Sequence, residues 1–253
     1  MRLASLGSGS KGNATLIAAG STLVMIDCGF SLKETRRRMQ RLGVAPEQLD
    51  AILVTHEHSD HSAGVAVLSR NASVPVYLTH GTASTGRIQS CHETVRFNAG
   101  DTFIIGDLSI QAIAVPHDAR EPCQYRVSYG DLCWGVLTDL GSITPHVIQS
   151  YSQCQGLMLE FNHDVDMLQA GEYPPALKRR VGGDWGHLNN HQAVQFLSAV
   201  GTEGLRHLVV AHVSENNNCL DRARSALSAV IDPTDERVIF ADQGDGLEWL
   251  SLA

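Results

Sequence analysis

The segment richest in possible chemistry is a cluster of histidines and acids at residues 55–61. His56 and His58 stand two residues apart, so they point the same way if the apolar strand-like run 51–54 continues in an extended form. Asp60 and His61 follow where the chain must turn, and they can face a second position nearby. Imidazole and carboxylate ligands suit Zn²⁺, Fe²⁺ or Mn²⁺. The segment predicts ligands for two adjacent cations; the alternative is a histidine-rich surface turn.

Four further polar residues stand where apolar, strand-like runs end: Asp27, His117, Asp139 and His212. In layered α/β folds, the C-terminal ends of the strands meet at the edge where the active site is built. Each residue alone could be an ordinary strand-end residue. The repetition predicts that buried strands deliver these side chains to one site.

The 55–61 segment and these four residues, in this order, resemble the signature of the metallo-β-lactamase superfamily. The resemblance implies that Asp27 orients the metal-binding loop through hydrogen bonds and is not itself a ligand. It implies one set of ligands for each of two ions and one bridging residue: His56, His58 and His117 for the first ion, Asp60, His61 and His212 for the second, and Asp139 for both.

Two divalent ions per chain, Zn²⁺ or Mn²⁺ with Fe²⁺ as an alternative, are therefore the expected cofactors. Ions about 3.5–4 Å apart can share a water, lower its pKa and bind a phosphoryl or carbonyl oxygen. The resulting metal-bridged hydroxide would be the attacking group. An aspartate at position 139 resembles the branches that act on thioesters and phosphodiesters, which argues against cleavage of β-lactams.

A candidate acid–base pair lies in the C-terminal half. Residues 186–193 open a helical pattern and resemble the final portion of tRNA 3′-processing endonucleases and related phosphodiesterases. There, a histidine before the helix pairs with a glutamate from a preceding strand and protonates the leaving oxygen; His187 and Glu160 stand at the matching positions. The expected catalytic residues are His187, Glu160 and Asp60. Alternatively, Glu160 caps a helix and His187 is a surface histidine.

Two polar loops are candidates for substrate binding. The glycine-rich segment 8–13 contains Ser10 and Asn13, and its backbone amides could cradle a phosphate. It lacks the spacing and the following helix of a P-loop, and a tight hairpin is an equal alternative. Asn216 and Asn217 follow His212 and could bind substrate or cap the next helix.

The net charge of −8 is a poor match to a large nucleic-acid surface. Two basic clusters could nevertheless guide an anionic polymer locally, although such runs are usually solvated faces. The first cluster contains Lys33, Arg36, Arg37, Arg38 and Arg41, and the second contains Lys178, Arg179 and Arg180.

The six cysteines form no C-x-x-C pair and lack the dense spacing of a disulfide framework. No apolar run reaches membrane-spanning length, and the N-terminus shows no signal-peptide pattern. These features predict reduced thiols in a cytoplasmic protein that does not bind a membrane.

Strand-like and helical patterns alternate along the chain without a repeat or a long linker, which predicts an α/β protein with a single domain over residues 1–253. The resemblance adds the arrangement: a four-layer αββα sandwich of two mixed β-sheets flanked by helices. Among the expected helices are those over residues 32–42, 81–90, 190–200 and 219–231.

Four motifs resemble the WalJ/YycJ-type branch of small metallo-β-lactamase-fold hydrolases: Ser-Gly-Ser-Lys-Gly-Asn at 8–13, Glu-x-Asn-His-Asp at 160–164, Gly-His-Leu-x-Asn at 186–190 and His-x-Ser-Glu-x-Asn-Asn at 212–218. The branch implies a DNA 5′-to-3′ exonuclease, with DNA ends favoured over RNA as substrate and the oligomeric state open. The alternatives are a phosphodiesterase for cyclic nucleotides or phosphonate diesters, a glyoxalase-like thioester hydrolase and a non-catalytic metal-binding module.

Overall fold

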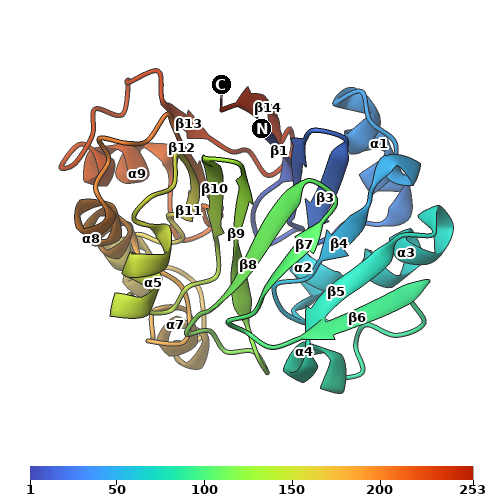
Figure 1. Ribbon diagram of the computed structural model, residues 1–253. Coiled ribbons are helices and arrows are strands. Elements are labelled where there is room, and N and C mark those ends of the chain that lie inside the picture. Colours follow the sequence, from blue (N-terminus) through green and yellow to red (C-terminus); the bar gives the residue numbers. More distant parts are fainter. Residues whose placement is uncertain (253) are drawn as a thin grey trace. The chain divides into compact units, whose positions relative to one another are not determined.

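The computed structural model describes residues 1–252, and the chain separates into two compact units (Figure 1). Unit 1 consists of Met1–Ala114, Ala119–Leu132 and the segment from Asp242 onward. Unit 2 consists of Val115–Asp118 and Cys133–Ala241. The single domain over residues 1–253 stays a prediction.

Unit 1 contains a seven-stranded mixed sheet in the order β14-β1-β2-β3-β4-β5-β6. Strands β14, β1, β2 and β3 pair antiparallel, and β3, β4, β5 and β6 pair parallel. The strands are β1 (Arg2–Gly7), β2 (Ala14–Ala19), β3 (Thr22–Ile26), β4 (Ala51–Leu53), β5 (Pro75–Thr79), β6 (Glu93–Phe97) and β14 (Leu247–Ser251).

β3 and β4 are buried along their whole length, because the sheet is covered by apolar side chains. Their parallel register pairs Ile26 with Leu53. The residues that follow these two strands, from Asp27 and from Val54 onward, therefore leave the sheet at the same edge.

The helices of unit 1 are α1 (Leu32–Arg41), α2 (Ser59–Ser62), α3 (Val65–Ala72) and α4 (His80–Ser84), with a short 3₁₀ turn η1 (Pro46–Gln48). Helix α1 begins where the Ser31 hydroxyl accepts a hydrogen bond from the Glu34 amide, and it buries Met39 in the apolar core. The helix expected over residues 81–90 is wrong in its extent. It ends at Ser84, and Gly86 then adopts a left-handed φ of 69°, which a helix cannot continue through.

The second sheet is also mixed, and its strands belong partly to each unit. The antiparallel strands β7 (Thr102–Ile105), β8 (Leu108–Ala114) and β9 (Cys123–Tyr129) lie in unit 1. The parallel strands β10 (Leu132–Leu137), β11 (Gly156–Glu160), β12 (His207–Ala211) and β13 (Val238–Phe240) form the sheet of unit 2. Their shared direction brings the ends of β10, β11 and β12 to one edge.

Unit 2 also contains five helices among the described residues: α5 (Pro145–Tyr151), α6 (Val165–Ala170), α7 (Pro175–Val181), α8 (Asn190–Val200) and α9 (Leu220–Leu227). Helix α8 packs against α5 and α9, with Phe196 edge-on to Tyr151. A capping box between Asn189 and Gln192 fixes the start of α8, with the N-cap two residues after His187. None of the described helices has the length and apolar character needed to cross a membrane.

Candidate metal centre and acid–base pair

Asp27 anchors the predicted ligands of unit 1. It follows β3, and its buried carboxylate accepts hydrogen bonds from the Thr55 amide at 2.8 Å and the Thr55 hydroxyl at 2.7 Å. Nδ1 of His61 lies 2.7 Å from the same carboxylate. Burial raises the pKa of Asp27, although His61 and Thr55 act in the opposite direction. These contacts are the ones that an orienting role requires, and this role stays a prediction.

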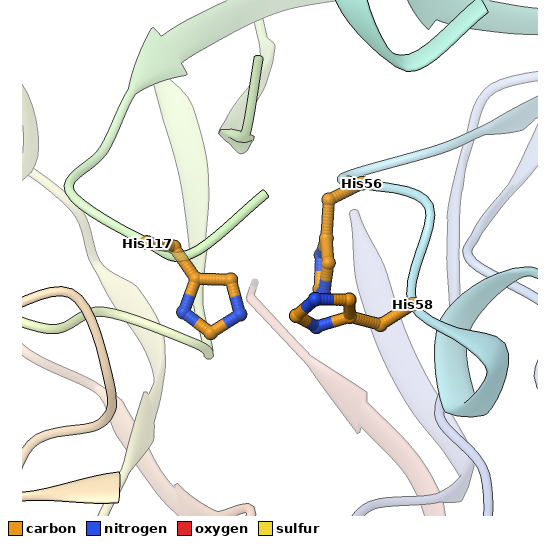
Figure 2. A group of neighbouring side chains, drawn as sticks. All are labelled: His56, His58 and His117. Carbon is orange, nitrogen blue, oxygen red and sulfur yellow. The ribbon is translucent and has the colours of Figure 1, made fainter. Parts of the chain in front are cut away.

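The first two predicted ligands leave the segment that follows β4, as Figure 2 shows for His56 and His58. Nδ1 of His56 lies 2.9 Å from the Thr55 hydroxyl, and its ring lies 4.5 Å from that of His58 and 4.3 Å from that of His61. The rings of His58 and His61 therefore both lie beside that of His56. An extended residue His58 followed at once by the short helix α2 produces this arrangement.

Asp60 and His61 lie in α2, next to Asn13 of the glycine-rich loop. The Asn13 amide donates to the Asp60 carbonyl at 2.8 Å, and its side-chain nitrogen lies 3.4 Å from an Asp60 carboxylate oxygen and 3.0 Å from His61 Nε2. The Asn13 side chain also closes its own loop, accepting from the Gly9 amide at 2.8 Å. The loop thus buttresses the second pair of predicted ligands.

His117 belongs to unit 2 and follows β8 (Figure 2). Its Nδ1 lies 2.9 Å from the Gly186 carbonyl oxygen, which can only accept, so Nδ1 donates and Nε2 carries the lone pair. This is the usual way in which a protein fixes the tautomer of a metal-binding histidine.

Asp139, His187 and His212 form a cluster within unit 2, at the edge where the parallel strands end. Each offers a ligand atom within 4.8 Å of the others. His212 Nδ1 lies 3.6 Å from Asp139 Oδ2, and His187 Nδ1 lies 3.6 Å from Asp139 Oδ1. The structure therefore brings the predicted bridging carboxylate, a predicted ligand and the predicted general acid together.

Glu160 ends β11 and is fully buried beneath this cluster. One carboxylate oxygen accepts from the backbone amides of Leu140 at 2.5 Å and Leu188 at 3.2 Å, and the other lies 3.1 Å from His187 Nδ1. Burial raises the pKa of Glu160, but the charge of His187 and its hydrogen bond outweigh it and lower that pKa to about 2. Burial lowers the pKa of His187, while Glu160 and Asp139 raise it to about 9. These shifts favour an ionised Glu160 carboxylate that holds a protonated His187 imidazole.

Three of the strand-end residues adopt a strained backbone. Asp27, Asp139 and His212 have φ angles of 60°, 55° and 52°, in the left-handed region that side chains with a Cβ rarely occupy. Such a conformation costs about 1–3 kcal/mol per residue and persists where the surroundings impose it, often at functional sites. It turns each polar side chain away from the strand direction.

The predicted substrate-binding residues differ in their surroundings. Ser10 is exposed in the glycine-rich loop, whereas Asn13 is buried against Asp60. Asn216 is exposed and donates to the Tyr173 hydroxyl at 3.3 Å; Asn217 is buried behind it. Substrate binding by these four residues stays a prediction, and the contacts of Asn13 favour a positioning role.

Sequence reasoning missed several groups that hold the predicted ligands in place. Thr55 links Asp27 to His56, the Gly186 carbonyl orients His117, and Arg180 of α7 pairs with Asp118 beside His117. Thr55 is part of the 55–61 segment, but a threonine beside a predicted ligand gives only a weak sequence signal for a supporting role. The carbonyl and the ion pair depend on tertiary contacts and leave no local signal.

The donor set fits divalent metal ions. Imidazole and carboxylate groups dominate it, and Gly186 engages Nδ1 of His117, so that Nε2 of His117 is the atom directed for ligation. Asp27 engages Nδ1 of His61 in the same way, and Nε2 of His61 lies 3.0 Å from the Asn13 side-chain nitrogen. A buried carboxylate beside imidazoles, as at Asp139, is likewise a ligand type that Zn²⁺ and Mn²⁺ accept.

The fold and the donor set define the class as a metal-dependent hydrolase of layered α/β architecture. Residues 22–213 match the family model described as the β-lactamase superfamily domain, and the chain belongs to this family. The resemblance seen in the sequence is confirmed, as is the fold class of two mixed β-sheets flanked by helices.

Curated relatives match almost the whole chain. The chain is 33% identical to exodeoxyribonuclease YycJ of Bacillus anthracis, over 90% of this chain and 88% of the relative. It is 32% identical to exodeoxyribonuclease WalJ of Streptococcus pneumoniae serotype 2, over 88% and 85% of the two chains.

Solved structures share the fold at lower identity. The metallo-β-lactamase fold protein YhfI from Bacillus subtilis matches with a TM-score of 0.76 and 17% identity, over 99% of both chains. The short form of human tRNase Z matches with a TM-score of 0.68 and 14% identity, over 100% of both chains.

Proposed function

We propose that this chain is a binuclear metal-dependent phosphodiesterase that degrades DNA from a 5′ end. It is a hydrolase that acts on phosphodiester bonds, as its curated relatives are. The observation that carries the proposal is the 3.1 Å contact between buried Glu160 and His187, which lies at the same strand edge as Asp139 and His212. A carboxylate-held imidazolium beside metal ligands supplies the proton that an alkoxide leaving group requires.

The two ions would be held by the ligands that the sequence predicts. His56, His58 and His117, drawn in Figure 2, would hold the first ion; Asp60, His61 and His212 would hold the second; and Asp139 would contact both. Zn²⁺ and Mn²⁺ suit this set. When bound, such ions lower the pKa of a water molecule and neutralise charge on the phosphoryl group.

The side chains of the chain perform the remaining steps. Asp27 holds His61 and Thr55 in place, and the Gly186 carbonyl holds His117, so the ligand geometry exists before substrate binds. His187, with 21% of its side chain exposed, faces the substrate side and delivers its proton to the 3′ or 5′ oxygen that leaves. Glu160 stays buried and keeps the ring oriented through Nδ1, so the transferable proton is the one on Nε2.

DNA as the natural substrate, and a cytoplasmic location, belong to this proposal. The named activity of the YycJ and WalJ relatives supports DNA, and six cysteines without a disulfide among the described residues are compatible with a reducing compartment.

The proposal is tested by a substrate panel with the purified protein and added Mn²⁺ or Zn²⁺. The panel contains linear DNA labelled at either end, RNA of the same sequence and bis-p-nitrophenyl phosphate. We expect stepwise release of mononucleotides from the 5′ end of DNA, abolished by His58→Ala and retained by His92→Ala, whose side chain is exposed in unit 1. Hydrolysis of the small diester alone would reject a nuclease, and no hydrolysis with either metal would reject an enzyme.

A further inference from the structure

Trp185 is the largest exposed apolar side chain among the described residues, with 64% of its surface accessible. Burying an aromatic side chain is worth about 1.5–3 kcal/mol, so an exposed indole forgoes this stabilisation. Single exposed apolar residues are common on protein surfaces. The position of Trp185 in the chain, two residues before His187, gives this one a specific interpretation.

The backbone around Trp185 is fixed by hydrogen bonds to α7. Gly182 donates to the Lys178 carbonyl at 3.0 Å, Gly186 donates to the Gly183 carbonyl at 2.8 Å, and His187 donates to the Val181 carbonyl at 2.9 Å. The loop that carries Trp185 is thus a short, closed turn on the end of a helix. An indole on such a turn is presented in one place rather than on a mobile arm.

Glycines allow this turn to approach the metal-binding edge closely. A Cβ on Gly141 would lie 2.6 Å from the Cα of Trp185, so only glycine fits there. Gly186 is packed equally tightly against the Arg180 carbonyl. Gly141 follows Asp139 by two residues and Trp185 precedes His187 by two, and two residues span at most about 7 Å. The backbone of Trp185 is therefore at most about 7 Å from that of His187 and at most about 11 Å from that of Asp139.

The adjoining helix offers positive charge. Arg180 is engaged by Asp118, and Lys178 donates to the Gln169 carbonyl at 2.5 Å. Arg179 is exposed and makes no ion pair with another described residue, so its guanidinium is available to a phosphate. Trp185 and Arg179 are thus an exposed aromatic residue and an exposed arginine six residues apart in the chain. Aromatic faces and positive charge together bind single-stranded nucleic acid.

We infer that Trp185 is a stacking platform for a nucleobase of the substrate strand, next to the phosphodiester that His187 protonates, with Arg179 binding the strand's phosphate. This inference rests on the proposed function and specifies its substrate as an unpaired strand end. Stacking requires an exposed base face, which a base inside a duplex does not offer.

The test compares Trp185→Ala, Trp185→Phe and the control Tyr129→Ala. Tyr129 is also an exposed aromatic residue, but it lies six residues along β9 from Cys123, which contacts Thr55, and is about 20 Å from the metal-binding edge of unit 1. On a single-stranded oligonucleotide we expect Trp185→Ala to raise KM about 5- to 150-fold, the range for losing one base–aromatic stack. Trp185→Phe should retain most of the affinity, and Tyr129→Ala all of it.

An oligonucleotide with an abasic residue at its terminal position isolates the stack. The unaltered enzyme should lose affinity for it, whereas Trp185→Ala should bind it and the intact oligonucleotide equally. A phosphorothioate oligonucleotide, which resists hydrolysis, should quench the tryptophan fluorescence of the protein, and Trp185→Phe should abolish the quenching.

The outcomes separate this inference from the proposed function. If the unaltered enzyme degrades DNA and Trp185→Ala has the same KM on both oligonucleotides as the unaltered enzyme, the stacking platform is wrong and the nuclease stands. If the unaltered enzyme degrades no DNA, the proposed function fails, and the absence of fluorescence quenching would then also reject the platform. A change of oligomeric state in folded Trp185→Ala, with KM unchanged, would instead identify Trp185 as a protein contact and overturn the inference.

Discussion

Replacing Asp27 by asparagine should weaken metal binding without altering any ligand. The new amide side chain would keep an oxygen for the Thr55 amide, now bonded at 2.8 Å, but its NH₂ group would face Nδ1 of His61, which lies 2.7 Å from the carboxylate. Two N–H donors would then face each other. The imidazole proton that Asp27 keeps on Nδ1 would shift toward Nε2, the nitrogen that the metal ion needs. Loss of such an outer contact costs about 10- to 100-fold in metal affinity, or about 1.4–2.7 kcal/mol.

The assay is calorimetric titration of metal-stripped protein with Zn²⁺ and with Mn²⁺. The ion held by His61 should weaken by that factor, because His61 contacts the carboxylate itself. The ion held by His56 and His58 should change less, because the link from Asp27 to His56 runs through the Thr55 hydroxyl. Asp50→Asn is the matched control: Asp50 accepts from the Leu23 amide at 2.8 Å, at the opposite end of β3. Unchanged affinity in correctly folded Asp27→Asn, or an equal loss in the control, would refute the orienting role.

Three further predictions concern the acid–base pair, acid stability and metal removal. His187→Ala should keep both ions while kcat falls about 10²- to 10⁴-fold, the usual contribution of a general acid. The control His146→Ala, on the exposed side of α5, should leave kcat unchanged. An unaltered kcat in His187→Ala would remove His187 from the mechanism. Hydrogen bonds from Arg37 and Arg38 lower the pKa of Glu34 from 4.5 to about 2, so the stabilisation from Glu34 is complete above pH 4.5 and disappears as the pH falls toward 2. The difference in the free energy of unfolding in urea between Glu34→Gln and the unaltered chain should therefore shrink between pH 6 and pH 3. A constant difference would contradict this prediction. Chelation should lower the thermal midpoint, because ions at 100 times their Kd stabilise the native state by about 2.7 kcal/mol each; equal midpoints with and without chelator would show that no ion is held.

The strands and the polar residues that end them could be predicted from the sequence because both signals are local. A run of buried apolar residues followed by Asp27, Asp139 or His212 is visible in the pattern alone. Within each sheet, parallel pairing then brings the ends of neighbouring strands to one edge of that sheet. The partnership of His187 with Glu160 was an expectation from the resemblance, and the two side chains lie 3.1 Å apart.

The supporting contacts could not be predicted, because they join residues far apart in the chain. The Gly186 carbonyl that orients His117 is 69 residues away from it, and Arg180 is 62 residues from Asp118. The left-handed conformations of the strand-end residues likewise arise from tertiary packing. The length of α4 was misjudged because the prediction ran through Gly86, whose low helical propensity is visible in the sequence and whose left-handed φ stops the helix.

The most direct test of the two-ion centre is a crystal structure of the metal-loaded protein with anomalous diffraction at the metal edge. We expect two peaks about 3.5–4 Å apart, with Asp139 between them, one bounded by His56, His58 and His117 and the other by Asp60, His61 and His212. A single peak, or ions bound away from Asp139, would contradict the account.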